Sequence, residues 1–338
     1  MRIVSRASAG LACFLFAWLV GFGCSSDELP EVVSSDDSTP GNPDVLFLVE
    51  VQARPDYRLV AYDPVAATTT PVFVIPEFGA LASFGADRAG ERLVLSYTED
   101  YRETGTGLYV LDLAREGAEG GKDATIEAIT DDGDLTELVA RQSDIVYDDV
   151  QFDAEAGTVW ATLEVPDQTS VVGIDVDSGE IVRTIDDAVE PAVGDGWVAF
   201  LAIESDDARR TVGVVDTESG EVTSFAVLDA QFDLGHLVAD PDRNRVLFTA
   251  LYPEDEPTIQ IGRPAEAHGA HDGPSQWLTL DLESGEVFQL VEHEPMAVRD
   301  ATMLSNGQLA ASGIDGVVVV DEPVEPLIES RYITELAS

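Results

Sequence analysis

Three stretches of the chain share one pattern: VVGIDVDSGEIVRTI at residues 171–185, TVGVVDTESGEVTSF at 211–225 and WLTLDLESGEVFQL at 277–290. In each stretch an alternating apolar segment ends at an aspartate, a glycine follows four positions later, and a second apolar segment begins directly after it. Alternation with period two is typical of β-strands, and Asp and Gly are typical of tight turns. Each stretch is therefore expected to form two antiparallel strands joined by a short turn.

The recurring aspartates and glycines are interpreted as turn residues rather than as catalytic groups. A carboxylate at a strand end can accept backbone N–H bonds in the following turn, and glycine supplies the positive φ that such turns need. Copies at equivalent places in successive repeats suit a structural turn, whereas catalysis needs side chains that converge on one site. The predicted turn residues are Asp175, Gly179, Asp216, Gly220, Asp281 and Gly285.

The pattern recurs beyond these three stretches. Looser copies end near Asp63, Asp112 and Asp321, and each repeated pair of strands follows another pair, as in VQFDAEAGTVWATLEV at 150–165. Four short strands per unit of about 40 residues predict the blades of a β-propeller. We expect an all-β fold with six four-stranded blades. Seven blades stay open as an alternative, because the long interval between Asp112 and Asp175 has room for a degenerate blade.

These repeats resemble the bacterial β-propellers of the YVTN, TolB-like and quinoprotein-like types over residues 45–338. The resemblance implies the architecture and no particular activity, because this fold hosts many unrelated functions. The first repeat starts at its second strand (VLFLVEV, 45–51). Since a closed ring avoids exposed sheet edges, we expect the C-terminal segment RYITELAS (331–338) to supply the missing innermost strand.

The N-terminal segment has the features of an export signal. Arg2 and Arg6 precede an apolar run of 14 residues, 10–23, whereas a membrane-spanning helix needs about 20. Residues 1–23 are therefore expected to be a signal peptide. The small residue followed by Cys24 resembles the bacterial lipoprotein signal, which implies that Cys24 is lipidated and becomes the mature N-terminus. The resemblance also implies sorting to the outer membrane, facing either the periplasm or the surface.

Residues 24–44 are expected to form a flexible acidic tether between the lipid and the propeller domain at 45–338. The segment is rich in Ser, Pro and acidic residues and has too little apolar surface to fold. Cys13 lies in the removable run, so the mature chain keeps one cysteine and no internal disulfide is expected.

Acidic residues dominate the composition, with 65 Asp and Glu against 18 Lys and Arg, a formal net charge of −47. This balance excludes a nucleic-acid binder, which needs clustered basic residues to neutralise phosphates. We interpret the carboxylates mainly as a solvated surface suited to salty surroundings. The alternative is a carboxylate-lined mouth of the propeller that collects Ca²⁺ or a cationic partner, although no calcium-binding motif is present.

Two histidines and an aspartate are weak candidates for metal ligands. His268, His271 and Asp272 have suitable donor atoms but lie in a Gly-rich insertion, where a solvated loop is favoured. The sequence contains no lipase elbow, P-loop or zinc-protease motif. We therefore expect an envelope-anchored module that binds or scaffolds a protein or small ligand. The alternative is a lactonase-like or quinoprotein-dehydrogenase-like enzyme with a metal or cofactor at the axis.

Overall fold

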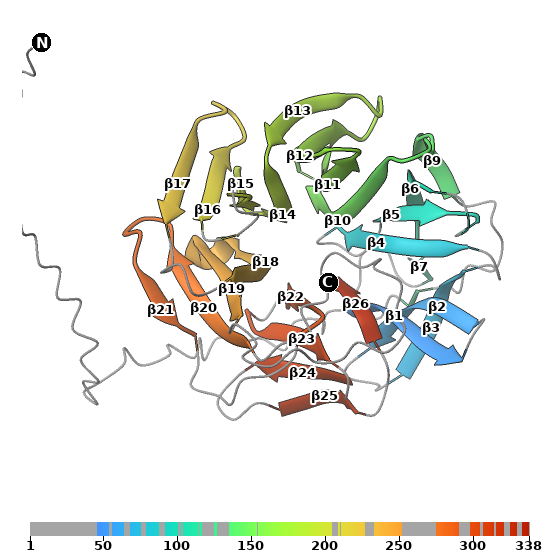
Figure 1. Cartoon of the computed structure of the whole chain (residues 1–338). Helices are drawn as coiled ribbons and strands as arrows, with labels where there is room; N and C mark the ends of the chain where they lie inside the picture. Colours follow the sequence, from blue (N-terminus) through green and yellow to red (C-terminus); the bar gives the residue numbers. More distant parts are fainter. Residues whose placement is uncertain are drawn as a thin grey trace, which may run out of the picture. The chain divides into compact units, whose positions relative to one another are not determined.

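The repeated stretches form the two outer strands of four-stranded antiparallel blades in the computed structural model (Figure 1). In blade 3, for example, β12 (Gln168–Asp175) and β13 (Ile181–Asp186) follow an inner pair, β10 (Val146–Asp153) and β11 (Thr158–Val165). Each strand pairs with the next one along the chain. The alternating pattern in the sequence therefore produces a meander of four strands.

The chain divides into two units, Met1–Thr39 and Pro40–Ser338, and every described residue belongs to the second. Within the part of the chain that the structure describes, no helix is long and apolar enough to cross a membrane. The described residues are 46–53, 56–63, 68–75, 79–87, 92–100, 102, 104–113, 115–116, 125–126, 135–153, 155–204, 209, 211–226, 233–251, 275–290, 298–304, 307–313, 316–320, 325–329 and 333–337.

The other five blades follow the same strand order from the innermost strand outward. Blade 1 contains β26 (Ile333–Ala337), β1 (Leu46–Ala53), β2 (Asp56–Asp63) and β3 (Thr68–Val74). Blade 2 contains β4 (Ala80–Ala86), β5 (Arg92–Thr98), β6 (Gly107–Asp112) and β9 (Leu135–Val139). Blade 4 contains β14 (Ala188–Val193), β15 (Trp197–Ala202), β16 (Thr211–Asp216) and β17 (Val222–Ala226).

Blade 5 contains β18 (Asp233–Asp240), β19 (Arg245–Leu251), β20 (Ser275–Asp281) and β21 (Val287–Gln289), with the 3-10 turn η2 (Pro241–Arg243) between its first two strands. Blade 6 contains β22 (Asp300–Met303), β23 (Leu309–Gly313), β24 (Gly316–Val320) and β25 (Glu325–Glu329). The described residues thus form six blades, as the repeats predict.

The interval between Asp112 and Asp175 holds no seventh blade among its described residues. It contains a small hairpin, β7 (Arg115–Glu116) and β8 (Thr125–Ile126), inserted before the last strand of blade 2. The first three strands of blade 3 account for most of the rest. The second long insertion, 252–274, lies outside the described residues.

The core consists of six apolar clusters, one between each pair of neighbouring blades. Side chains alternate between the two faces of a strand, so a strand that is buried on both faces supplies two clusters. In β11, Val159 and Ala161 join the cluster with blade 2, whereas Trp160 joins the cluster with blade 4. The innermost strands also contact one another in cyclic order, which closes the ring.

The C-terminal segment closes blade 1, as expected from the missing strand. β26 pairs antiparallel with β1 as its innermost strand, and the register joins Phe47 to Ala337, Leu48 to Leu336 and Glu50 to Ile333. The two ends of the domain therefore share one sheet. This arrangement covers the edge of β1 that would otherwise offer unpaired backbone groups to other chains.

The three near-identical repeats form what we call the rim turns, residues 175–180, 216–221 and 281–286, which join the third and outermost strands of blades 3, 4 and 5. In the first, Asp175 Oδ1 accepts bonds from the Ser178 N–H at 2.8 Å and from the Ser178 Oγ–H at 2.7 Å. The Gly179 N–H donates to the Asp175 carbonyl at 2.8 Å. Asp216 with Ser219 and Asp281 with Ser284 repeat these bonds.

Glycine is required at the first rim turn for two reasons. Gly179 has a φ of +68°, which strains residues with a side chain. A Cβ at this position would also collide with the carbonyl oxygen of Leu138 in blade 2. The turn therefore fixes both the chain reversal and the approach of the neighbouring blade.

Candidate functional site

Three neighbouring blades carry a bulge with a polar residue in the innermost strand. The register of pairing with the second strand shifts at each bulge, between Asp148 and Gln151, between Val189 and Ala192, and between Gly235 and Val238. The backbone is left-handed within each one, with φ of 48° at Asp149, 52° at Glu190 and 53° at His236. This conformation is uncommon for residues other than glycine, and bulges near functional sites often re-aim a side chain.

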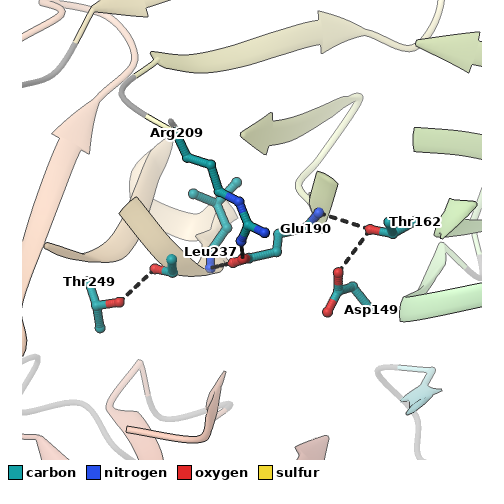
Figure 2. Close-up of polar contacts among 7 residues, drawn as sticks. Asp149, Thr162, Glu190, Arg209, Leu237 and Thr249 are labelled. Carbon is teal, nitrogen blue, oxygen red and sulfur yellow. Dashed lines mark hydrogen bonds and ion pairs between the residues drawn. The ribbon is translucent and has the colours of Figure 1, made fainter. Parts of the chain in front are cut away.

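Thr162 on β11 links the first two bulges (Figure 2). Its Oγ1–H donates to Asp149 Oδ2 at 2.8 Å, and the same oxygen accepts the backbone N–H of Glu190 at 3.0 Å. A single buried hydroxyl thus holds the Asp149 carboxylate in blade 3 and the bulge of blade 4 in a fixed relation.

Glu190 links the second bulge to the third. Its Oε1 forms an ion pair with Arg209 Nη1 at 2.7 Å, and its Oε2 accepts the backbone N–H of Leu237 at 3.4 Å (Figure 2). The two charged side chains are only 11% and 19% exposed. Arg209 comes from the connection between β15 and β16, and its carbonyl accepts the Leu234 N–H of blade 5. The pair therefore joins blades 4 and 5.

Two adjacent carboxyl groups, Asp148 and Asp149, and the three carboxylates whose charges raise their pKa values are here called the central carboxylates: Asp148, Asp149, Glu164, Glu190 and Asp300. Burial raises the pKa of Asp149 to about 7, with a further rise from the charge of Glu190, against the opposing effects of Thr162 and Arg209. Burial and the neighbouring Asp149 raise the pKa of Asp148 well above its usual value, with smaller effects from Glu164 and Asp300. Because Asp300 belongs to blade 6, opposite blade 3, this influence crosses the centre of the ring.

The pKa of His236, in the third bulge, shifts in the opposite direction. Burial lowers its pKa to about 4, a backbone hydrogen bond with Val298 opposes the change, and the charge of Arg209 adds to it. The imidazole is therefore neutral at physiological pH. The centre of the ring thus contains a carboxyl group, Asp149, with a pKa of about 7, a neutral imidazole and the ion-paired Arg209.

The Asp149→Asn variant is expected to be more stable than the native protein at pH 8, by about 4 kcal/mol, and by less than about 1 kcal/mol at pH 4. The folded-state pKa of Asp149, about 7, lies above its ordinary value of 3.8, so the folded state binds the extra proton. The stability that this group supports is present at low pH and is lost as the pH rises toward 7. Asparagine cannot ionise, so it removes that loss.

Urea unfolding of both proteins at pH 4, 6 and 8 measures this difference. His236 acts with the opposite sign, because its folded-state pKa of about 4 lies below 6.5 and stability is lost as the pH falls between these values. That contribution is common to both proteins and cancels in the comparison. A stability difference that is the same at pH 4 and pH 8 would contradict the raised pKa of Asp149.

The residues selected from the sequence do not meet at this centre. The rim-turn aspartates lie between the outer strands, where the bonds from Ser178, Ser219 and Ser284 lower the pKa of each carboxylate. Cys24 and the possible metal ligands His268, His271 and Asp272 lie outside the described residues. Within the described ranges, no group of three His, Cys, Asp or Glu side chains is close enough to hold a metal ion.

A mainly solvated acidic surface is expected from the sequence, and this expectation does not account for the central carboxylates. Asp148 and Asp149 lie at the first bulge and are only partly exposed. A signal was present in the sequence: VYDDVQF, AVEPAV and LGHLVAD each place a polar residue where an innermost strand should continue its apolar alternation. Such an interruption is typical of a bulge.

Comparisons with known proteins support the architecture. No protein-family model matches the chain, and no curated protein matches it in sequence. Among solved structures, a chain from a nidogen/laminin complex is similar with a TM-score of 0.55 and 11% identity, over 87% of this chain and 97% of that one. A protein of unknown function from Bacteroides caccae has a TM-score of 0.51 and 12% identity, over 87% and 98%.

A third similar structure is a putative TolB from Agrobacterium tumefaciens, with a TM-score of 0.50 and 12% identity over 82% of this chain and 91% of that one. Identities this low establish a shared fold and no shared activity. The chain is a six-bladed β-propeller whose first blade is closed by its last strand.

Proposed function

We propose that this protein is an envelope-anchored β-propeller lipoprotein that binds a positively charged ligand at the central carboxylates. The observation that carries the proposal is the polar network of Asp149, Thr162, Glu190 and Arg209 between blades 3, 4 and 5, together with the further carboxylates whose charges act on Asp148 and Asp149. The anchor is proposed from the sequence alone, from the export signal and Cys24.

Charge balance favours a cation as the ligand. Each central carboxylate would carry one negative charge when ionised, and Arg209, paired with Glu190, supplies one positive charge. The raised pKa values of Asp148 and Asp149 mean that the free protein ionises these groups at an energetic cost. A bound cation would lower that cost. Both aspartates remain partly exposed.

Spermidine and Ca²⁺, titrated at pH 7 and constant ionic strength, serve as probes of this site. We expect one of them to bind and to release protons, because a nearby positive charge lowers the pKa of Asp149 below its value of about 7. Calorimetry in two buffers of different ionisation enthalpy measures the released protons. The Asp149→Asn variant should bind about tenfold more weakly and release fewer protons.

Asp167→Asn is the matched control, since it removes one charge from an exposed aspartate between β11 and β12 that is also left-handed, with φ of 70°. Its affinity should stay within about twofold of the native value. Failure of both probes to bind, or equal weakening by the two variants, would refute the proposed site. Loss of palmitate labelling in a Cys24→Ser variant tests the anchor, and an unlabelled native protein would refute it.

One observation favours a second function, catalysis by acid and base. Asp148 and Asp149 are adjacent carboxyl groups whose raised pKa values keep a proton available near neutral pH, as in enzymes that use paired carboxyl groups. Hydrolase or dehydrogenase turnover that is abolished by Asp149→Asn and kept by Asp167→Asn would support an enzyme. Cation binding without turnover would support the binding module.

A further inference from the structure

Among the described side chains, the large apolar ones that stay exposed share one place in the blades. Among the described residues, every large hydrophobic side chain that stays exposed lies on the outermost strand of blade 3, 4 or 5. They are Ile181 at 49%, Val182 at 60%, Val222 at 49%, Val287 at 37% and Phe288 at 43% exposure. Single exposed apolar residues are normal on protein surfaces, but repetition at one position of three adjacent blades is not expected by chance.

Each of these apolar residues follows a rim turn that is rich in carboxylates. Every turn offers three of them, one that accepts the serine bonds and two that are exposed to solvent. The two in each turn that do not accept these bonds are Asp177 and Glu180, Glu218 and Glu221, and Glu283 and Glu286. The hydrogen bonds of the first carboxylate lower its pKa, so it is ionised at physiological pH. The same acidic turn followed by an apolar residue thus occurs three times in succession.

The three rim turns form a continuous surface around the ring. Arg183 on β13 reaches the next turn, where its guanidinium donates to the carbonyls of Asp216 at 3.4 Å and Thr217 at 3.3 Å. Phe225 on β17 lies against the third turn, 3.5 Å from where a Cβ of Gly285 would stand. Figure 1 shows β13, β17 and β21 as successive outer strands of the ring.

The charge of the rim turns limits which kind of partner can bind there. A second copy of the chain carries the same net charge of −47 and would be repelled, and so would an anionic membrane surface. Nine carboxylates around five apolar side chains complement a partner that presents cations and apolar groups together. Charged side chains on edge strands usually prevent pairing with other chains. The outermost strands of blades 3, 4 and 5 begin instead with apolar residues, so this protection is incomplete.

We propose that the rim turns of blades 3, 4 and 5, with the apolar residues that follow them, are a docking surface for a protein segment rich in both basic and apolar side chains. The surface is separate from the central carboxylates and does not depend on the function proposed for them. The carboxylates attract the segment and set its position, and the apolar residues contribute to the free energy of binding by burial.

A labelled peptide of four Lys-Val-Ser repeats serves as the probe, with fluorescence anisotropy at physiological salt as the measurement. We expect the native protein to bind it at least tenfold more tightly than a peptide of four Lys-Ser-Ser repeats, which has the same charge without the apolar groups. Two variants, Ile181→Ser/Val222→Ser/Val287→Ser and Glu180→Gln/Glu221→Gln/Glu286→Gln, should each weaken binding about tenfold or more.

A strongly acidic protein attracts any basic peptide, so the control variant must lose the same number of charges. It therefore removes three negative charges away from the rim turns. The control residues are three exposed aspartates at the opposite ends of the strands: Asp144 between β9 and β10, Asp167 between β11 and β12, and Asp187 between β13 and β14. Their backbone is left-handed, a conformation that asparagine also adopts readily. The triple Asp→Asn variant should weaken binding less than about threefold. Equal weakening by this control, equal binding of both peptides, or no binding would overturn the proposal.

A measurement on otherwise native protein covers the case in which a rim variant folds poorly. A photo-crosslinking residue placed at Val222 should capture the Lys-Val-Ser peptide, and the same residue at Asp167 should not. Capture at both positions or at neither would contradict a rim docking surface. The Asp149→Asn variant should bind the peptide normally, which separates this surface from the central site.

Discussion

Deletion of residues 331–338 is expected to destabilise the domain by more than about 4 kcal/mol, a large share of the stability of a typical domain. The deletion removes β26, so β1 loses the pairing of Phe47, Leu48 and Glu50 with the last strand. It also removes the contacts of β26 with β4, β22 and β23 in the neighbouring blades. The ring opens between blades 6 and 1, and the apolar cluster between them becomes exposed. Thermal unfolding followed by circular dichroism measures the loss.

Two controls separate the missing strand from a general effect of truncation. Deletion of Ser338 alone leaves β26 complete and should leave the melting temperature unchanged. A synthetic peptide of residues 331–338, added to the truncated protein, should restore part of the lost stability in proportion to its concentration. An unchanged melting temperature after the full deletion would mean that the ring does not need its closing strand.

The Arg209→Gln variant should lose about 3–5 kcal/mol of stability, the usual cost of removing one partner from a buried ion pair. It leaves Glu190, whose side chain is 11% exposed, without the cation 2.7 Å from its Oε1. The loss should be larger at pH 8 than at pH 5. Arg209 lowers the pKa of Asp149, so its removal raises that pKa further, and a raised carboxyl pKa costs stability as the pH increases.

The double variant Glu190→Gln/Arg209→Gln should recover most of this loss, because both charges are then absent. Arg183→Gln is the matched control, since Arg183 donates to two backbone carbonyls on the rim, and it should cost less than about 1 kcal/mol. Urea unfolding at the two pH values measures all three variants. Equal costs for Arg183→Gln and Arg209→Gln would mean that the central pair contributes no more than a surface arginine.

Local patterns explain why the architecture could be predicted from the sequence. The rim turns depend on residues within six positions of one another, so the Asp, Ser and Gly of 175–179 indicate the turn directly. Strand alternation then defines which residues are buried between blades. The closing strand follows from a physical requirement, because β1 would otherwise leave an edge unpaired.

The centre of the ring could not be predicted in the same way, because its contacts join distant parts of the chain. Glu190 lies 28 residues from Thr162, 19 from Arg209 and 47 from Leu237. The bulges that turn Asp149 and Glu190 inward are known only once the register of strand pairing is known. Their burial depends further on the closure of all six blades. The local sequence shows where the apolar alternation of an innermost strand is interrupted. It does not show which way the polar side chain at that place will point.

Closure by β26 also sets the order of events when the chain is made. Phe47 and Ala337 are partners in the sheet and lie 337 − 47 = 290 residues apart, so blade 1 cannot be completed until residues 333–337 have been made. Contacts of such long sequence separation form slowly. For a chain that is exported, as we propose, this delay keeps the ring open while the polypeptide still has to thread through a translocation channel. Until residues 333–337 have been made, β1 keeps an unpaired inner edge, and the fold of blade 1 waits for them.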